Sequence, residues 1–440
     1  MSTGAQEIYD VVGIGFGPSN LSLAIALEEH PANFPNRTVS AAFFERQAAF
    51  GWHRNMLLPS TAMQVSFLKD LATFRNPESR FTFVSYLHAS GRLASFVNKQ
   101  NFYPTRQEFH RYLEWAESNF ADRVSYGSQV TGVRLAPPTT ARSPQHLQVE
   151  VQNGTGTRVV NARNAVISTG LAPRMPDGVD RDEHVWHSSE FLDRFRQSRP
   201  DELKQVAVVG AGQSGAEITR FLYDYLPHAR IFAIIPSYGY SIADSTPFAN
   251  QVFDPTAVDD FYFGTDRTRA AFWQYHKNTN YSVVDDEVIR DLHQRAYDQE
   301  VCGESRLQFL NLTRVHEIKR VGGDTRVYLE SLQDDGMDEL DVDAIVFATG
   351  YNAMDPTGLL GDLDHLCLRD EPGGRHQIGR DYRLLTTSEL SCGIYLQGGT
   401  EHTHGLTSSL LSNIAVRSGE IADSIVRRCA EEERVGSPRD

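Results

Sequence analysis

Residues Asp10-Val-Val-Gly13-Ile-Gly15-Phe-Gly17-Pro18 are the strongest indication of the fold, and a helical pattern over 20–28 comes directly after them. A second stretch repeats the design, Val206-Ala-Val-Val-Gly210-Ala-Gly212-Gln213-Ser214-Gly215, with a helical pattern over 216–226. Each reads as an apolar strand, a tight glycine turn and a helix N-terminus, whose amides and dipole receive a pyrophosphate. One such turn is a weak signal. Two in one chain predict two dinucleotides, usually held to pass a hydride from a nicotinamide to a flavin.

Composition sets the outer limits of the interpretation. A chain of 440 residues is long enough for two or three domains. Its formal net charge of −15 argues against nucleic acid and against anionic membranes as partners. No apolar run approaches membrane-spanning length and no signal peptide is visible, so we expect a soluble, cytoplasmic protein. The cysteines do not form a Cys-x-x-Cys pair, so neither a metal site nor a disulfide framework is expected: Cys302, Cys367, Cys392 and Cys429.

The order of the segments predicts an α/β fold in which a second Rossmann-like unit is inserted into the first. Two similar short strands, Ala165-Val-Ile-Ser-Thr-Gly170 and Ala344-Ile-Val-Phe-Ala-Thr-Gly350, read as returns to a sheet edge at the boundary between the units. The first unit is expected over 1–170 and 341–440. The second is expected over 171–239 and 301–340.

Between 240 and 300 the alternation of strands and helices is lost, and the sequence is rich in Asn, Asp and aromatic residues. We expect a small, mainly helical insertion on the substrate side; a lid or an oligomer contact without a ligand role is an equally open interpretation. Two segments are expected outside regular structure, a surface loop over 137–144 and a disordered charged tail over 431–440.

Glu45 directly follows the apolar strand 41–44 of the first unit. An acidic residue at this place can accept both hydroxyls of an adenosine ribose. Its distance in sequence from Gly17 is longer than is common for this motif, and a solvated glutamate at a strand end is the alternative interpretation.

Four further stretches resemble the flavin-dependent N-hydroxylating monooxygenases of siderophore and peptide biosynthesis. The resemblance runs from about residue 9 to 425 and is closest to the actinobacterial L-ornithine N5-monooxygenases of the kutzneride-pathway type. The stretches are Asp343-x-x-x-Phe347-Ala-Thr349-Gly350-Tyr351-x-x-x-x-Pro356, Met63-Gln64-Val-Ser-Phe-Leu-Lys69-Asp70, Asn278-Thr-Asn280-Tyr-Ser-Val-Val-Asp285 and His404-Gly-Leu-x-x-x-Leu-Leu-Ser412.

The resemblance implies FAD in the first unit, NADPH in the second and L-ornithine as substrate. In this family NADPH reduces FAD, O2 adds to give a C4a-hydroperoxyflavin, and the unprotonated amine attacks the distal oxygen. The intermediate survives only where water is excluded. No side-chain base is obligatory, but an amine with a pKa near ~10 must lose its proton on entry, which burial favours. A homo-oligomer, specifically a tetramer, is also implied.

Lys69 is the most informative single charge, because it lies in an otherwise apolar stretch. From the residues alone we would favour a solvated pair with Asp70 at a helix end. The resemblance instead implies that Lys69 receives the substrate carboxylate, that Asn250 and Asn280 bind the α-amino and carboxylate groups, and that Ser412 lies near the substrate. An amino-acid zwitterion needs both a cation and neutral amides, so the set is chemically coherent.

A further set is implied to bind the cofactors. Taken alone, most of its members would be ordinary core or surface residues. For FAD the residues are Gly13, Gly15, Gly17, Pro18, Glu45, Trp52, His53 and Gln64. For NADPH they are Arg106, Gly210, Gly212, Gln213 and Ser214. Thr349 and Gly350 are implied to bind a cofactor without a choice between the two.

The end of the second strand of the NADPH unit departs from the family pattern. Many relatives carry an arginine there that grips the adenosine 2′-phosphate, whereas this chain reads Ile234-Ile235-Pro236-Ser237. No acidic residue appears there to favour NAD. We therefore expect NADPH to be preferred, but less strongly than in relatives with the arginine.

Three rival functions remain for comparison. The nearest is a lysine N6- or diamine N-hydroxylase of the same fold, because the motifs specify the substrate head group better than its chain length. A disulfide reductase with two Rossmann units is set aside because the chain lacks a redox cysteine pair. A non-catalytic nucleotide-binding regulator is the plainest alternative.

Overall fold

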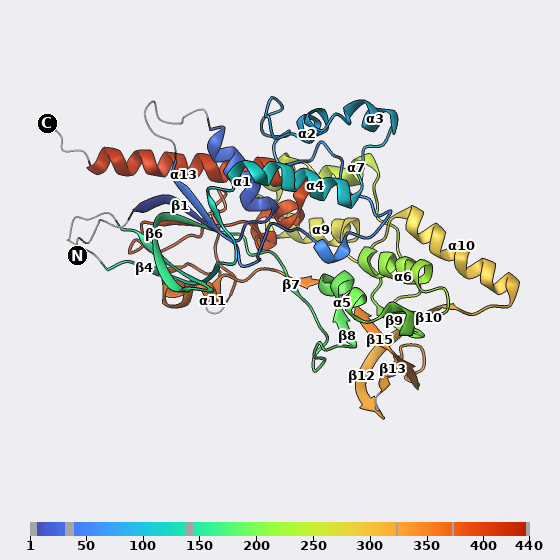
Figure 1. Ribbon diagram of the computed structural model, residues 1–440. Helices are drawn as coiled ribbons and strands as arrows, with labels where there is room; N and C mark the ends of the chain where they lie inside the picture. The colour runs from blue at the N-terminus through green and yellow to red at the C-terminus, as the bar shows by residue number, and fades with distance from the viewer. Residues whose placement is uncertain (1–6, 31–38, 138–144, 323, 372–373, 437–440) are drawn as a thin grey trace.

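The computed structural model describes residues 7–30, 39–137, 145–322, 324–371 and 374–436, which form two units, each built around a sheet (Figure 1). The first sheet has the order β3 (Val124–Ser125), β2 (Ala41–Phe44), β1 (Ile8–Ile14), β6 (Gly156–Ile167), β5 (Leu147–Asn153), β4 (Gln129–Leu135), with β17 (Gly393–Leu396) beside β6. The second has the order β11 (Leu307–Asn311), β10 (Arg230–Ile235), β9 (Gln205–Val209), β15 (Ala344–Phe347), β8 (Val185–His187).

The first unit encloses the helix α1 (Pro18–Glu28), which starts at the glycine turn after β1. Its Pro18 occupies the first turn, where the missing N–H costs nothing. Apolar residues of α1 are buried on nearly every face, because the sheet lies on one side and α13 (Ile414–Gly436) lies along the other. Chain segments from both ends of the sequence therefore complete one core.

Further helices of the first unit pack beside α1, and the aromatic side chains between them form a separate core. They are α2 (Phe83–Ala89), α3 (Leu93–Asn98) and α4 (Arg106–Glu117), and a short helix α11 (Thr357–Leu360) lies against β4 on the other side.

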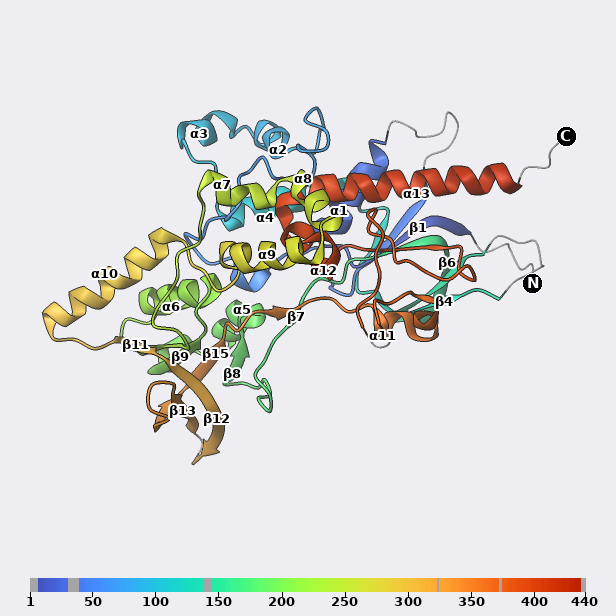
Figure 2. The same cartoon turned by 180° about the vertical axis from the view of Figure 1, so that it is seen from behind.

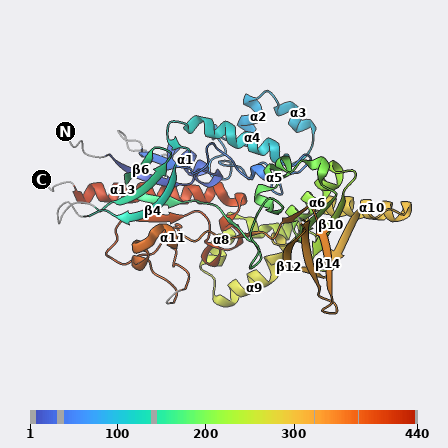
Figure 3. The ribbon, with the colours of Figure 1, turned by 60° about the horizontal axis from the view of Figure 1, so that its bottom comes forward.

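In the second unit, all pairings within the five-membered strand order are parallel, as the sequence pattern predicts for a Rossmann-like sheet. The helices α5 (Phe191–Gln197), α6 (Gln213–Tyr225) and α10 (Asp286–Cys302) share a buried apolar core with this sheet. An antiparallel sheet of β12 (Thr313–Val321), β13 (Asp324–Ser331) and β14 (Met337–Val342) covers its other face (Figure 3).

The two similar short strands of the sequence lie inside the sheets, so the prediction of sheet edges is wrong. The first becomes the end of β6 and pairs with β1, and the second becomes β15 and pairs with β9. Each is thus the neighbour of a strand that leads into a glycine turn. Their resemblance is explained by this shared position, since the residue after each strand must pass close to the turn backbone.

A narrow two-stranded link joins the units. β7 (Ala172–Pro173) pairs antiparallel with β16 (Tyr351–Asn352), and it lies between the two sheets in Figure 1. The inserted helices α7 (Pro247–Asn250), α8 (Pro255–Tyr262) and α9 (Asp266–His276) lie across the middle of the molecule, as the view from behind shows (Figure 2). There α8 packs on α12 (Glu401–His404) of the first unit.

The structure moves two of the expected limits between the units. Residue 341 was the expected return to the first unit, but β15 still belongs to the second sheet. Residue 300 was the expected end of the insertion, but Val288 and Leu292 of α10 are buried in the core of the second unit. The division into an FAD unit, an NADPH unit and an insertion is retained as a proposal with these changes.

The structure bears differently on the two segments expected outside regular structure, the loop over 137–144 and the tail over 431–440. The loop predicted over 137–144 falls, apart from Pro137, outside the described residues. The tail predicted to be disordered from 431 is helical as far as Gly436, where α13 ends, and its last four residues are not described. Among the described helices, none combines the length and apolar character needed to cross a bilayer.

Candidate active site

The first glycine turn is shaped by contact with β6. Gly15 has φ +85°, and a Cβ there would lie 2.4 Å from the carbonyl oxygen of Ser168. A larger residue would clash with fixed backbone. Gly17 at the N-cap of α1 is different, because no protein atom lies within 4 Å of its missing Cβ. The protein itself therefore leaves open the space over the helix N-terminus, which is the place where a bound pyrophosphate requires close approach.

Glu45 lies where β2 ends and is buried, so it is not the solvated residue of the alternative interpretation. Its Oε2 accepts the N–H of Phe16 in the turn at 2.8 Å, and its Oε1 accepts the N–H of Gln47 at 2.8 Å. Each carboxylate oxygen retains a further lone pair. Glu45 therefore fixes the turn to β2 and can still accept the ribose hydroxyls proposed for it.

The second glycine turn repeats this geometry against β15. Gly210 has φ +140°, and a Cβ there would lie 2.5 Å from the carbonyl oxygen of Ala348. Gly212 is the N-cap of α6, with Ser282 of the insertion as its nearest neighbour. Gln213 and Ser214 are the first residues of that helix. The start of α6 is therefore open on the turn side and flanked by the segment that precedes α10.

Three residues assigned to the two cofactors, Gln64, Arg106 and Gln213, meet in one polar network. Arg106 forms a bidentate ion pair with the buried Glu217, at 2.8 and 2.9 Å. Gln213 donates to Glu217 and to Asp285, both at 2.9 Å, and accepts the Asp285 N–H at 2.8 Å. Gln64 donates to the other oxygen of Asp285 at 3.1 Å. The network joins the first unit, α6 and the insertion.

Glu217 and Asp285 were missed as site residues. Glu217 stands four positions after Gln213 in α6, so the helical repeat could have indicated that their side chains share a face. Asp285 closes one of the family-like stretches but received no role. The bidentate pair also opposes any role for Arg106 as a free cation for a 2′-phosphate.

Trp52 and His53 lie at the junction of the two units. The His53 side chain is exposed, yet protein crowds it from most directions, and this environment with the nearby Arg106 cation lowers its pKa to about 4. Its ring centroid lies 4.8 Å from that of Trp52 and 6.4 Å from that of Tyr351, which belongs to the link between the units.

Thr349 and Gly350 directly precede the strand β16 of that link. Arg174 donates from Nε and Nη2 to the Thr349 carbonyl, at 3.0 and 2.6 Å, and its backbone N–H donates to the Gly350 carbonyl at 3.0 Å. The imidazole of His187 contacts the same Gly350 carbonyl from β8, at 3.0 Å. The structure thus gives both residues a role in joining the units, and their direct contact with a cofactor stays a proposal.

Lys69 and Asp70 do not form the solvated pair considered from the residues alone. Asp70 is buried, and its carboxylate accepts the backbone N–H groups of Ala72, Thr73 and Phe83 at 2.6–2.9 Å. It therefore shapes the loop before α2. Lys69 is partly buried, with an ion-pair partner for its ammonium absent among the described residues. Burial lowers the Lys69 pKa, and the nearby Asp254 carboxylate opposes the shift only in part.

The insertion brings Asn250 toward Lys69. The Lys69 ammonium lies 5.7 Å from the ring centroid of Phe253, in the turn η5 (Gln251–Phe253) that begins directly after Asn250. This turn packs on the turn η8 (Leu406–Ser409) of the first unit. Asn250 donates to the Ser245 carbonyl at 2.9 Å, which fixes the orientation of its amide.

Asn280 approaches the same turn η8 from the other end of the insertion. The phenol of the next residue, Tyr281, donates to Glu401 at 2.5 Å. Ser409 of η8 donates to the same Glu401 oxygen at 2.7 Å. Ser412 comes three positions later. All four proposed substrate residues are therefore connected to the segment 406–412.

In that segment and close to it in sequence, several buried polar atoms lack a hydrogen-bond partner among the described residues. They include the hydroxyls of Thr400, Ser408 and Ser412 and the side-chain carbonyl of Asn413. Buried polar groups in proteins nearly always have partners. Together with the open space at Gly17, these atoms indicate that the residues present fit a bound flavin nucleotide and a polar substrate.

The end of β10 carries a turn at the position of the missing arginine. Pro236 and Ser237 form this turn, in which the Ser237 hydroxyl donates to the Gly239 carbonyl at 2.8 Å. The turn therefore presents a hydroxyl in place of a guanidinium. Arg106 is engaged with Glu217 and therefore does not supply a replacement cation for the 2′-phosphate.

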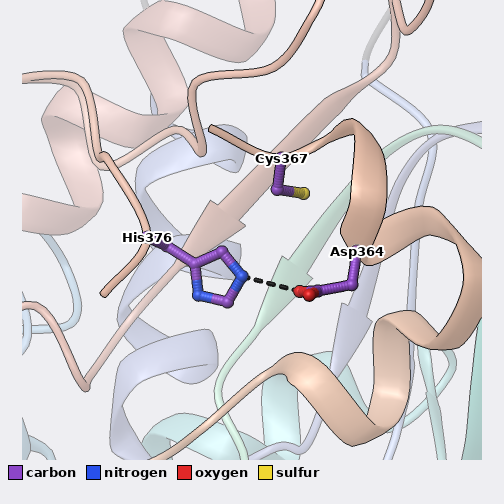
Figure 4. Close-up of side chains that lie close together, drawn as sticks. All are labelled: Asp364, Cys367 and His376. Carbon is purple, nitrogen blue, oxygen red and sulfur yellow. Dashed lines mark hydrogen bonds and ion pairs between the residues drawn. The ribbon is translucent and has the colours of Figure 1, made fainter. Parts of the chain in front are cut away.

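Asp364, Cys367 and His376 are close enough to share a metal ion, but their surroundings argue against one (Figure 4). His376 contacts one Asp364 oxygen at 2.7 Å, and the Arg369 guanidinium binds the other at 2.7 Å. Burial raises the pKa of the Cys367 thiol to about 11. A metal ion here would have to displace the Arg369 guanidinium or the His376 ring from the Asp364 carboxylate. The absence of a bound metal therefore remains our prediction.

Comparison with known proteins establishes the family. The profile of the L-lysine 6-monooxygenase/L-ornithine 5-monooxygenase family matches residues 7–353, which includes both glycine turns. The chain belongs to this family. An L-ornithine N(5)-monooxygenase from Pseudomonas aeruginosa is 36% identical and is matched over 96% of this chain and 95% of its own length.

Solved structures of family members agree over almost the whole chain. The ornithine N-hydroxylase KtzI of Kutzneria sp. 744, solved with reduced FAD, NADP+ and L-ornithine, has a TM-score of 0.92 and 59% identity, and covers 96% of this chain and 100% of its own. The L-lysine 6-monooxygenase of Pseudomonas syringae is less similar, with a TM-score of 0.81 and 29% identity over 96% of this chain and 99% of its own.

Proposed function

We propose that this chain is an L-ornithine N5-monooxygenase that uses FAD, NADPH and O2. One observation carries the proposal: two glycine turns and an unpaired Lys69 ammonium occur in a chain 59% identical to an ornithine N-hydroxylase. The family as a whole includes lysine hydroxylases, and the greater similarity to the ornithine enzymes favours ornithine. The product, an N-hydroxylated ornithine, suits siderophore or nonribosomal peptide biosynthesis.

The first glycine turn and Glu45 would hold FAD, and the second turn with Gln213 and Ser214 would hold NADPH. FAD reduced by NADPH supplies the activated oxygen, one atom of which enters the substrate amine while the other leaves as water. The chain itself orients the substrate. Lys69 would bind the carboxylate, and Asn250 and Asn280 would bind the rest of the head group.

The surroundings of the side-chain amine, at the end of the substrate opposite to the carboxylate that Lys69 would bind, have a separate effect. Where they exclude water, they raise the free energy of a charged ammonium, which favours its neutral, nucleophilic form. They also keep water from the reacting oxygen, because the insertion covers this side of the first unit (Figure 2). No side chain is required as a base under this proposal.

The decisive test measures hydroxylamine formation and NADPH oxidation with ornithine, lysine and putrescine. Ornithine should give hydroxylamine coupled to NADPH oxidation. Lysine, one methylene longer, should give much less, because misplacing the amine by about 1 Å can cost two orders of magnitude in rate. Putrescine lacks the carboxylate and should bind poorly. NADPH oxidation that no amine stimulates would support a nucleotide-binding regulator instead.

A variant at the first turn tests the assignment of FAD. Replacing Gly15 with Val should abolish flavin binding, because its Cβ would meet the Ser168 carbonyl and the turn could not keep φ +85°. The measurement is the flavin-to-protein ratio after purification, with Gly91→Val as control, since Gly91 also has positive φ but a Cβ there meets no protein atom within 4 Å. Full flavin content in the Gly15 variant would refute the assignment.

We further propose a homo-oligomer, specifically a tetramer, working in the cytoplasm. The insertion and the turn before it expose several aromatic side chains that a partner subunit could cover: Tyr238 in the turn, and Phe248, Phe263 and Tyr275 in the insertion. No disulfide joins the cysteines of the described residues, as is usual in a reducing compartment. Light scattering of the purified protein measures the oligomeric state directly.

A further inference from the structure

Arg417 is a fully buried guanidinium without an anionic partner among the described residues. Only 1% of its surface is exposed, and its contacts are to neutral oxygens. Nη1 donates to the Ser408 carbonyl at 2.5 Å, Nη2 to the Ser19 hydroxyl at 3.2 Å and Nε to the side-chain carbonyl of Gln397 at 3.5 Å. An arginine remains charged in such a site, and a buried charge without a counterion is costly.

A chain of buried hydrogen bonds leads from Arg417 to the first glycine turn. Gln397 donates to the Ser19 carbonyl and to the Asn20 side chain, both at 3.1 Å. Asn20 in turn donates to the carbonyl of Gly15 at 2.7 Å. Since Ser19 is the second residue of α1, the guanidinium of α13 lies directly beside the N-terminus of that helix.

The first turn of α1 therefore combines two positive features, because a helix N-terminus is itself a positive pole. The nearest carboxylates are already engaged. Glu420 pairs with Arg380 at 2.7 and 2.8 Å, and Glu45 accepts two backbone N–H groups. A diphosphate at the turn would supply the missing negative charge.

We infer that Arg417 is a positioning residue for the diphosphate of FAD. Through Ser19 and the Gln397–Asn20 chain it holds the turn in the shape that binds phosphate, and its charge adds to the potential of the helix end. The same guanidinium binds the Ser408 carbonyl, so it also ties the turn to the segment that carries Ser412. This inference rests on the proposed function, which places FAD at the first turn.

The test compares Arg417→Met, Arg417→Gln and Arg417→Lys with wild type, each as flavin-free protein titrated with FAD and each unfolded in urea with and without FAD. Loss of the charge should weaken FAD binding about 10- to 100-fold in the Met and Gln variants, whereas Lys should retain most of the affinity. Removing a charge that lacks an anionic partner should cost the flavin-free Met variant only the hydrogen bonds to three neutral oxygens, and therefore less stability than the same change costs the FAD-bound protein. The FAD-bound Met variant should be less stable than FAD-bound wild type.

Arg380→Met is the matched control, because Arg380 is partly buried but paired with Glu420 and Asp259. It should destabilise both forms and leave the FAD affinity within about twofold of wild type. If Arg417 had only a structural role, Arg417→Met would also destabilise both forms and leave the FAD affinity unchanged, and that result would overturn the inference. Equal FAD affinities of the Arg417→Gln and Arg417→Lys variants would overturn it as well. If the Met variant does not fold, the comparison of FAD affinities between Arg417→Gln and Arg417→Lys tests the inference, which expects the Lys variant to bind FAD more tightly. Wild type that does not bind FAD would instead refute the proposed function.

Discussion

At the scale of single residues, the adjacent side chains of Lys69 and Asp70 have different roles. Lys69 and Asp70 carry opposite charges, yet the Asp70 carboxylate accepts backbone N–H groups of its own loop, and an anionic partner of Lys69 is absent among the described residues. A buried carboxylate that receives several N–H donors needs no ammonium beside it. This division leaves a cation available for the substrate carboxylate.

Replacing Lys69 with Ala should weaken ornithine binding by about 2 kcal/mol or more, roughly 30-fold, because the substrate carboxylate then lacks its cation. FAD binding should not change. Equilibrium titration of the flavoprotein with ornithine measures the effect, and the exposed Lys99→Ala is the control. Unchanged ornithine affinity in the Lys69 variant would remove Lys69 as the carboxylate anchor.

His404 shows how burial fixes a protonation state. The side chain is 1% exposed and stacks on Tyr382 with ring centroids 4.0 Å apart, and burial lowers its pKa to about 3. Its pKa in the unfolded chain is near the ordinary ~6.5, so the unfolded state binds an extra proton between these values. The stability due to neutral His404 is therefore complete above about pH 6.5 and declines as the pH falls toward 3.

From pH 7.5 to pH 5 this single group should cost about 2 kcal/mol of unfolding free energy. A His404→Gln variant should be less stable at pH 7.5 and should lose less on acidification than wild type. Urea unfolding at both pH values measures the two differences, while His53, whose pKa is also lowered, acts equally in both proteins. The same loss on acidification in both proteins would show that His404 does not cause it.

At the scale of elements, corresponding strands produce corresponding turns. β6 beside β1 and β15 beside β9 each bring a carbonyl against a glycine, at Gly15 and at Gly210. The two units differ at the end of the next strand: Glu45 comes after β2, whereas Pro236 and Ser237 come after β10. The residue at this strand end contacts the adenosine ribose of a bound dinucleotide, so this difference affects the choice between NADPH and NADH.

NADPH should be preferred over NADH by a smaller factor than in relatives with an arginine after β10. The Ser237 hydroxyl donates its one hydrogen to the Gly239 carbonyl, so a 2′-phosphate would have to replace that bond to gain a neutral contact, which is weaker than a bidentate guanidinium. Steady-state kinetics with both nucleotides gives the ratio of kcat/KM values. A Pro236→Arg variant should raise this ratio, and equal use of NADH by wild type would contradict the expected preference.

At the scale of the whole molecule, apolar and polar contacts together hold the two nucleotide units, since Met56 and Leu58 of the first unit are buried in the core of the second. The covalent connection is only the narrow link of β7 and β16. The pair of Arg106 in α4 with Glu217 in α6 joins the units at a second place and is buried on the Glu217 side. Hydride transfer requires close and fixed placement of two rings held by different units.

A Glu217→Ala variant should therefore slow anaerobic reduction of the flavin by NADPH by about tenfold or more, with little effect on FAD content or ornithine affinity. Stopped-flow absorbance of the flavin measures the rate. Glu202→Ala, which removes an exposed pair with Arg199 inside one unit, is the control and should reduce normally. Normal reduction of the Glu217 variant would show that the pair does not set the geometry for hydride transfer.

The amino-acid sequence alone specified the two glycine turns, the parallel strands that lead to them and the helices after them, because strand pattern, turn chemistry and helix start are local properties of a few adjacent residues. It did not specify which strand lies beside each turn or that α13 covers α1. The packing of the folded chain brought Arg106 to Glu217, 111 residues away, and placed Arg417 beside Ser19. Such contacts depend on how whole elements pack, and no short stretch of sequence encodes the balance of burial and charge that results.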